Sequence, residues 1–244
     1  MSAPRTRVEI RQISIVHHSR RFAGKKSVRP NPGERGLVGR LPTSLQVSGC
    51  LEASGNSKGP RVTPLPEQEW NDGVRDILNR TIKEGPGGKA ENIYATLARA
   101  PVLLRRMLPF AGTLNAGEIN PVDRELLILR TAWNCSCEYE WGHHTLIAKH
   151  LGVSQRDVDR IAAYPLDRNW EHHQAMLLDA ADDLHHRSAV NDDLWFDLRE
   201  EFSEQQLIEL PLLVGMYHAL AFALTTLGVQ REQGVPGFST PRPG

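Results

Sequence analysis

Apolar residues recur every three or four positions through most of the chain beyond residue 62, the spacing that places them on one face of a helix. No stretch alternates apolar and polar residues for long enough to predict a strand. The pattern predicts helices over residues 64–84, 93–98, 102–114, 121–132, 137–150, 155–163, 170–186, 191–202 and 204–227. The predicted fold class is therefore all-α, with one helical domain at residues 62–233 and a flexible tail at 234–244 that is rich in glycine and proline.

Capping residues and helix breakers mark the ends of these helices. Pro121 suits the first turn of a helix, whereas Pro109 predicts a bend or a restart in the third one. Ser203 with Gln206 has the pattern of a capping box before the last predicted helix, and Gly228 suits its end.

The last predicted helix is apolar around most of its circumference rather than along one stripe. Leucine, valine, alanine and phenylalanine occupy both faces of residues 207–224. Such a helix lies in the centre of a core or in an interface between subunits. We therefore expect the domain to form a homo-oligomer.

Residues 1–61 differ from the rest of the chain in charge and pattern. They contain twelve Lys and Arg against three Glu, so the net charge of zero for the whole chain combines a basic segment with an acidic remainder. Their apolar residues show no sustained helical or strand period. We interpret this segment as a disordered basic N-terminal extension, with an organelle transit peptide as the alternative. It lacks the interleaved aromatic residues and motifs of a nucleic-acid-binding arm, so no nucleic-acid partner is expected.

The cysteine count and the absence of certain motifs limit the cellular compartment and the cofactors that we expect. Three cysteines are too few for a disulfide framework, which favours a reducing, cytoplasmic environment. The longest early apolar run is too short for a signal sequence or a membrane span, so no membrane partner is expected. Because the chain contains no glycine-rich phosphate loop, dinucleotide fingerprint or serine-hydrolase elbow, we predict no cofactor.

Residues 121–153 concentrate side chains that carry chemistry. Glu125 lies on one predicted helix, and Cys137, Glu140 and His144 share one face of the next. Cys137 is placed at a helix N-terminus, where the helix dipole favours a thiolate. Glu140 and His144 lie one turn apart, close enough to share a proton. These four residues are the predicted catalytic residues.

The order of these residues resembles the carboxymuconolactone decarboxylase family, which includes the AhpD-like alkylhydroperoxidases. The residues that match are Glu125, Cys137, Glu140, Trp141, His144, Ala148, Gly152 and Ser154. The resemblance covers residues 64–229 and implies an all-helical AhpD-like domain that assembles into trimers or hexamers. The peroxidase branch of the family has a Cys-x-x-Cys pair, and here Glu140 replaces the second cysteine.

The incomplete dithiol favours proton-transfer chemistry. We expect a cofactor-free decarboxylase or isomerase acting on a small lactone or carboxylated organic acid, in which Glu140 and His144 transfer protons and Glu125 orients or reprotonates them. A second hypothesis is a thiol peroxidase in which Cys137 attacks a peroxide and Cys135 resolves the sulfenic acid. A third is a non-catalytic helical oligomer.

Neighbouring residues allow two further interpretations. Glu140 with His143, and Asp182 with His185, have the carboxylate-x-x-His spacing of di-iron helix bundles. Asp182 is shorter than the glutamate that such a site uses, so we predict no metal. His143 is expected to face solvent or an interface, and Arg124 and Arg130 could hold a substrate carboxylate.

Overall fold

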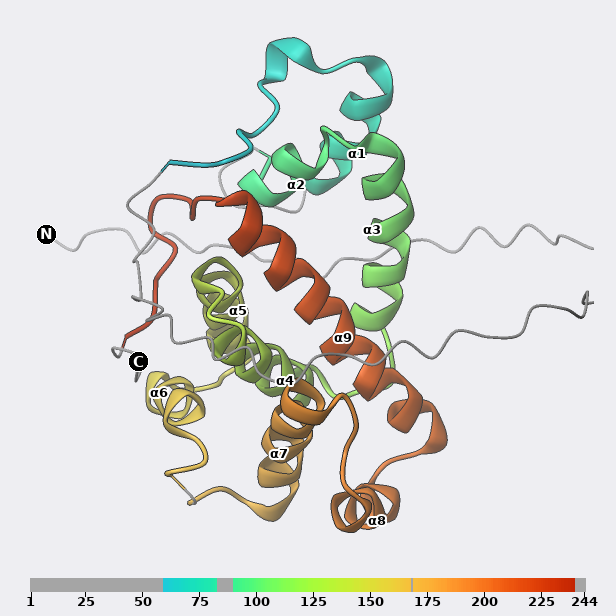
Figure 1. Cartoon of the computed structure of the whole chain (residues 1–244), viewed down its shortest axis with the longest axis vertical. Helices are drawn as coiled ribbons and strands as arrows, with labels where there is room; N and C mark the ends of the chain where they lie inside the picture. The colour runs from blue at the N-terminus through green and yellow to red at the C-terminus, as the bar shows by residue number, and fades with distance from the viewer. Residues whose placement is uncertain (1–58, 83–89, 168, 240–244) are drawn as a thin grey trace, which may run out of the picture. The chain divides into compact units, whose positions relative to one another are not determined.

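The computed structural model describes residues 59–82, 90–167 and 169–239 (Figure 1). Within these residues there is no strand, and the elements are one short 3-10 helix and nine α-helices. They are η1 (Glu67–Glu69), α1 (Asp72–Ile82), α2 (Asn92–Leu97), α3 (Pro101–Asn115), α4 (Pro121–Asn134), α5 (Glu138–His150), α6 (Gln155–Ala163), α7 (His172–Arg187), α8 (Asp192–Glu201) and α9 (Glu204–Leu227). The predicted all-α class is confirmed, whereas nearly all of the basic N-terminal extension lies outside the described residues.

Helix α4 lies at the centre of the helical unit. It contacts α5, α6, α7 and α9, and its residues 125–133 are all buried. Four consecutive apolar residues, 126–129, cover every face of the helix, as burial on all sides requires. The main core around α4 includes Leu129, Trp141, Ile161, Leu177 and Leu213. This central position carries the polar residues of α4 into the interior as well.

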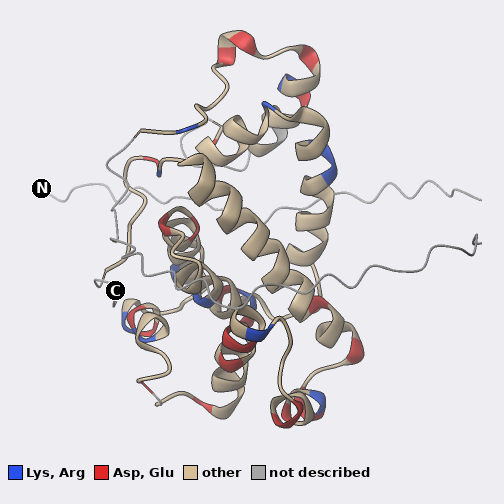
Figure 2. Ribbon diagram, viewed as in Figure 1, with Lys and Arg blue, Asp and Glu red and all other residues tan. Residues whose placement is uncertain are grey.

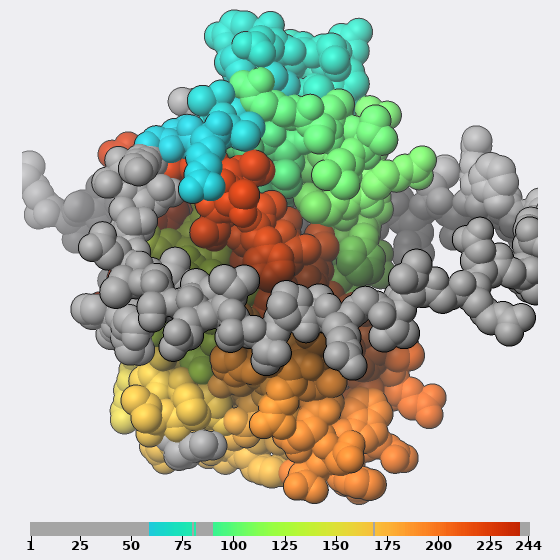
Figure 3. All heavy atoms as spheres, viewed as in Figure 1, coloured from blue at the N-terminus to red at the C-terminus, as the bar shows by residue number. Residues whose placement is uncertain are grey.

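Helices α1, α2 and α3 pack on one another and build a second, smaller core. Its buried residues are Val74, Ile77, Leu78, Ala98 and Leu104. In Figure 3 the blue-to-cyan atoms that begin the described chain lie against the green atoms of α3. Helix α3 runs without a break through Pro109, so the helix does not restart there.

Helix α9 contacts α3, α4, α7 and α8. Its capping box forms as predicted, since the amide of Gln206 donates to Ser203 Oγ and the amide of Ser203 donates to Gln206 Oε1, and the helix ends at Gly228 with φ 67°. Figure 2 shows little charge along α9 because residues 210–227 contain no Lys, Arg, Asp or Glu. By length and composition alone α9 could cross a membrane, and in this structure it packs against four other helices.

One face of α9 stays exposed in the single chain. The residues on this face follow one another at helical spacing, and we call them the α9 stripe: Ile208, Leu212, Gly215, Ala219 and Phe222. Phe222 is 61% exposed and Ile208 is 63% exposed. Thus α9 is a core helix on one side, as predicted, and an apolar surface on the other.

The C-terminal segment corrects the predicted boundary at residue 233. Phe238 packs edge-on against Trp133, with ring centroids 4.9 Å apart, and also contacts Trp141 at 5.5 Å. Val235 is buried, and the backbone of Pro236 passes close to α5. The sequence pattern missed this packing because the segment has no regular period. Residues 234–239 therefore belong to the domain rather than to a flexible tail, and residues 240–244 lie outside the described part.

Candidate functional site

A tight turn between α4 and α5 places the first of the predicted catalytic residues. Helix α4 ends at Asn134, Cys135 is its C-cap, and Ser136 adopts a left-handed conformation with φ 58°. The amide of Cys137 donates to the carbonyl of Ala132 over 2.9 Å. Cys137 is thereby the N-cap of α5, so its predicted position at a helix N-terminus is confirmed.

Glu125 and His144 form a hydrogen-bonded pair between α4 and α5. His144 Nδ1 lies 2.7 Å from Glu125 Oε2, and Arg124 Nε lies 3.7 Å from the other carboxylate oxygen. Arg124 is itself held by a hydrogen bond of 2.7 Å from Nη1 to the carbonyl of Asn115. An ionised carboxylate only accepts, so Nδ1–H donates to Glu125 and Nε2 is left to exchange a proton.

Glu140 is buried and unpaired on the same helix as His144. It is 3% exposed, and neither carboxyl oxygen has a hydrogen-bond partner among the described residues. Burial raises the pKa of Glu140 well above its ordinary value, which favours the neutral acid. Glu140 and His144 make no direct hydrogen bond in this structure, because Nδ1 of His144 is bonded to Glu125 and neither Glu140 oxygen has a partner among the described residues.

The Cys137 thiol does not have the predicted thiolate character. The side chain is 2% exposed, and burial, followed by the nearby charge of Glu140, raises the pKa of Cys137 to about 12. The backbone amide of Glu140 at the start of the helix and the Thr225 side chain both lower this pKa, but they do not offset burial. The helix N-terminus lowers the pKa of Cys137, as predicted, but burial raises this pKa by more.

Tyr217 of α9 completes the group, and the sequence analysis did not single it out. Its ring meets the His144 ring edge-on at 5.0 Å, and its hydroxyl donates to Asn115 Oδ1 over 3.3 Å. Burial, and then the carboxylates of Glu125 and Glu140, raise the pKa of Tyr217 well above its usual range. The one available signal was a residue with a polar tip inside a helix that carries little other polarity.

A second carboxylate, Glu232, holds the other histidine of the motif. His143 Nε2 lies 2.6 Å from Glu232 Oε2, while Glu232 Oε1 accepts from Tyr139 Oη at 2.9 Å and from the amide of Asn92 at 2.6 Å. Burial alone would raise the pKa of Glu232, but the hydrogen bonds from His143 and Asn92 bring it below its ordinary value. His143 is thus half-buried and held by a residue of its own domain, so the prediction that it faces solvent is wrong, while an interface at this position stays a prediction. No pattern in the sequence pointed to Glu232.

Glu91, the N-cap of α2, is a further acidic neighbour of the two histidines. Burial raises its pKa, the charges of His143 and His144 oppose this shift, and the charge of Glu232 adds to it. The site therefore has a second carboxyl group whose pKa burial raises above its ordinary value.

The di-iron spacing does not assemble among the described residues. Asp182 accepts from Arg130 at 2.6 Å and 2.9 Å and from Asn134 Nδ2 at 2.7 Å, while His143 is bonded to Glu232. The bidentate pair also occupies Arg130, which is buried and donates to the carbonyl of Ile161 as well. Arg130 therefore supports the core and is not free to hold a substrate carboxylate.

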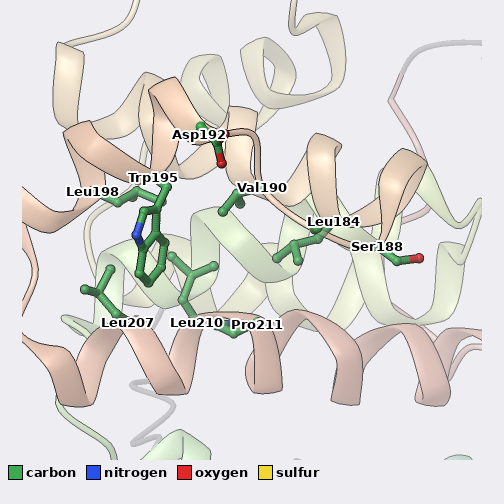
Figure 4. A pocket seen from close by; sticks show the side chains of 10 residues that line it. Leu184, Ser188, Val190, Asp192, Trp195, Leu198, Leu207, Leu210 and Pro211 are labelled. Atoms are coloured by element: carbon green, nitrogen blue, oxygen red, sulfur yellow. The ribbon is translucent and has the colours of Figure 1, made fainter.

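A cavity of about 420 Å³ lies elsewhere, between α7, α8 and α9 (Figure 4). Its lining is mostly apolar and includes Leu184, Val190, Trp195, Leu198, Leu207 and Pro211. None of the four predicted catalytic residues lines it. Those four residues are instead packed closely between α4, α5 and α9.

Sequence comparison agrees with the motif. Residues 101–166 match the model described as the carboxymuconolactone decarboxylase family, and this range contains Glu125, Cys137, Glu140 and His144. The predicted resemblance is confirmed. No curated protein matches the chain by sequence.

Solved structures share the fold at low sequence identity. A peroxidase-related protein from Ralstonia eutropha JMP134, described as an alkylhydroperoxidase AhpD core, superposes with a TM-score of 0.63 at 21% identity, covering 70% of this chain and 92% of that chain. A peroxidase-related protein from Silicibacter sp. TM1040 gives 0.60 at 14% identity, covering 72% and 91%. The debrominase Bmp8 gives 0.58 at 17% identity, covering 70% and 92%. The predicted AhpD-like fold is confirmed.

Proposed function

We propose that the protein is a cofactor-independent acid/base enzyme of the decarboxylase or isomerase type. Its substrate is a small lactone or carboxylated organic acid. The support is that residues 101–166 match the carboxymuconolactone decarboxylase family and that the surrounding helices have the AhpD-like fold. The observation that carries the proposal is the Glu140 carboxyl group, which is buried without a hydrogen-bond partner among the described residues. A buried polar group without a hydrogen bond lowers the stability of the fold, and a catalytic role is one explanation for keeping it.

Glu140 has the properties of a general acid. Its raised pKa favours the protonated carboxyl group, and no described neighbour competes for that proton. When an unsaturated lactone acid loses carbon dioxide, the bond to the carboxylate carbon breaks and its electron pair remains in the ring as a dienolate. Glu140 then delivers its proton to carbon.

The Glu125–His144 pair restores the acid. After proton delivery Glu140 is a buried carboxylate, which its surroundings disfavour, so it recovers a proton readily. His144 Nε2 relays this proton from water, while the Nδ1 bond to Glu125 keeps the ring oriented. In an isomerase the same two groups would remove a proton at one carbon and return it at another.

A thiol peroxidase is the second candidate, and one observation favours it. Cys135 and Cys137 are separated by a single residue and their thiols interact electrostatically, so an attacking and a resolving thiol are both at hand. The high pKa of Cys137 opposes this reading, because the nucleophile is the thiolate.

The decisive experiment measures turnover on a panel of lactone acids and of alkyl hydroperoxides with a dithiol reductant. Glu140→Gln should lower turnover of the lactone acid by about a hundredfold or more, because the amide keeps the shape but cannot donate the proton. Glu138→Gln is the matched control, since Glu138 lies on the same helix, is exposed and pairs with Arg231. Circular dichroism would check the fold of both variants.

Cys137→Ser separates the two candidates. In the acid/base enzyme it should reduce activity much less than Glu140→Gln does. Dithiol-dependent peroxide consumption that is lost in Cys137→Ser and retained in Glu140→Gln would replace our proposal with the peroxidase. Absence of turnover on the whole panel would favour the non-catalytic oligomer.

A further inference from the structure

Three side chains from three different helical elements meet behind the α4–α5 turn. They are Cys135 at the C-cap of α4, His185 on α7 and His218 on α9, and each is half-buried. The Cys135 Sγ atom and one ring nitrogen of each histidine all lie within 4.8 Å of one another. The proposed reaction uses none of the three.

The two histidines are oriented by hydrogen bonds. His218 Nδ1 lies 2.9 Å from the carbonyl oxygen of Val214, one turn earlier, and a carbonyl only accepts, so Nδ1 carries the hydrogen. His218 Nε2 therefore directs a lone pair at His185 Nδ1, which is 2.9 Å away. A backbone carbonyl that fixes the far nitrogen of an imidazole is the usual support of a metal-binding histidine.

The surrounding charge suits a cation. Cys135 lies at the C-terminal end of α4, where the unpaired carbonyl groups form the negative end of the helix dipole. The guanidinium of Arg130 is paired in bidentate fashion with Asp182, which lies one turn before His185. At His185 the attraction of a positive charge to Asp182 exceeds its repulsion from Arg130.

We propose that Cys135, His185 and His218 bind one Zn²⁺ ion, with water at the fourth position. A thiolate and two imidazoles are the ligands that Zn²⁺ prefers, and three protein ligands with one open position is a common coordination. In a tetrahedral site, zinc bonds of about 2.0 Å to nitrogen and about 2.3 Å to sulfur place the ligand atoms roughly 3.3–3.5 Å apart. The two ring nitrogens, now 2.9 Å apart, would move slightly apart to admit the ion.

Zinc binding is a ligand exchange in which protons are displaced and no group is oxidised or reduced. The ion displaces the proton of the Cys135 thiol, which is released to solvent, and the proton between the two rings moves to His185 Nε2. No electron is transferred. The ion would join the end of α4 to α7 and α9, and it would remove Cys135 from any role as a resolving thiol. The proposal does not depend on the acid/base reaction.

The test uses the full chain, treated with a chelator and then titrated with Co²⁺ as a spectroscopic probe and with Zn²⁺ in competition with a chromophoric chelator. One equivalent should bind, with a thiolate-to-cobalt charge-transfer band that Cys135→Ser abolishes. His185→Ala and His218→Ala should each weaken Zn²⁺ binding by about a hundredfold or more, because even residues that only support a metal ligand cost ten- to a hundredfold. His186→Ala and Cys137→Ser are the matched controls, and both should keep the band.

A second measurement needs no variant. Zn²⁺ should protect Cys135 of the unmodified protein from alkylation, read by mass spectrometry of the peptide that contains it. Equal affinity in the unmodified protein and Cys135→Ser, or alkylation of Cys135 at the same rate with and without one equivalent of Zn²⁺, would overturn the proposal. The cluster would then be a hydrogen-bonded pair of neutral histidines beside a thiol.

Discussion

His144 is bonded to Glu125 on the neighbouring helix, at 2.7 Å, and not to Glu140 on its own helix. The two carboxyl groups consequently have different surroundings. Glu125 lies between an imidazole and the Arg124 guanidinium, whereas Glu140 has neither a charge partner nor a hydrogen bond among the described residues. Carboxyl groups whose surroundings push their proton affinities apart are typical of sites in which one acts as an acid and the other as a charged support.

Glu140→Met should stabilise the protein while it removes activity. The substitution replaces an unpaired buried carboxyl group with an apolar side chain of similar length, so the free energy of unfolding should rise by about 1–3 kcal/mol. Urea unfolding monitored by circular dichroism measures this change. A loss of stability would show that Glu140 has a partner which the fold depends on.

The stability that Glu140→Met gains over the native protein should increase with pH. The pKa of Glu140 is raised in the folded state from an ordinary value of 4.5, so above pH 4.5 the unfolded chain releases the proton while the folded chain keeps it. The unfolded state then binds fewer protons, and stability falls as pH rises, until pH passes the folded pKa. Unfolding of the native protein and Glu140→Met between pH 4 and pH 9 should therefore give diverging curves. Parallel curves would contradict the raised pKa.

The Cys137 thiol should react slowly with alkylating reagents. With a pKa of about 12, only roughly one thiol in 100,000 is a thiolate at pH 7. Cys135 is less buried, and in metal-free protein it should be labelled by iodoacetamide at least about tenfold faster. Mass spectrometry of the peptides gives both rates, and labelling in denaturant is the control. Rapid labelling of Cys137 at pH 7 would restore the peroxidase as the better function.

Gly142→Ala should detach the C-terminal segment from α5. A methyl group at this position would overlap the carbonyl oxygen of Pro236 and lie 2.6 Å from Val235 Cγ1. Because a backbone oxygen cannot turn away alone, we expect a loss of about 1–3 kcal/mol in unfolding free energy. Tryptophan fluorescence should also shift to longer wavelength as Phe238 leaves Trp133.

The matched control is Gly73→Ala, outside the α9 stripe. Gly73 is also inside a helix, but an added methyl group would meet only the ends of the Arg105 and Asn71 side chains, at 3.3 Å and 3.4 Å. Alanine is the better helix former, so this variant should be unchanged or slightly more stable. If both variants lose the same stability, the contact with Pro236 is not the cause.

The α9 stripe should bring subunits together. We propose a trimer or hexamer, and light scattering at micromolar concentration should give three or six times the mass of one chain. Phe222→Glu places a charge in the exposed apolar stripe and should shift the mass towards the monomer. A charge at an exposed position outside the stripe, in Glu138→Lys, should leave the mass unchanged. A monomeric native protein would refute the proposal.

The elements of this fold could be predicted because local rules decide them. Helix α6 begins and ends where Ser154 and the apolar period placed it, and α9 follows its capping box and Gly228. Cys137 and His144 were recognisable because their spacing places them on one helix face, and Glu125 because it precedes them on the helix before. Each of these inferences needs only residues within a few positions of one another.

The remainder depended on contacts between distant residues. The choice of Glu125 over Glu140 as the partner of His144 depends on how α4 packs against α5. The pKa of Cys137 is set mainly by burial. The sequence showed that this cysteine lies at a helix N-terminus but not that it is buried. Likewise, His143 is held by Glu232, 89 positions away, in a segment without a regular pattern.

Glu232 also has a consequence for how the domain opens. Helix α2 has only six residues, and its N-cap Glu91 makes no side-chain cap bond. Its first amide, that of Asn92, is bonded to Glu232, 140 positions further along, and the Asn92 side chain donates to the carbonyl of Gln230. So short a helix frays unless something holds its start. Residues 92–97 and 230–235 should therefore exchange their amide hydrogens as one cooperative unit, which is local unfolding shared by two remote parts of the chain.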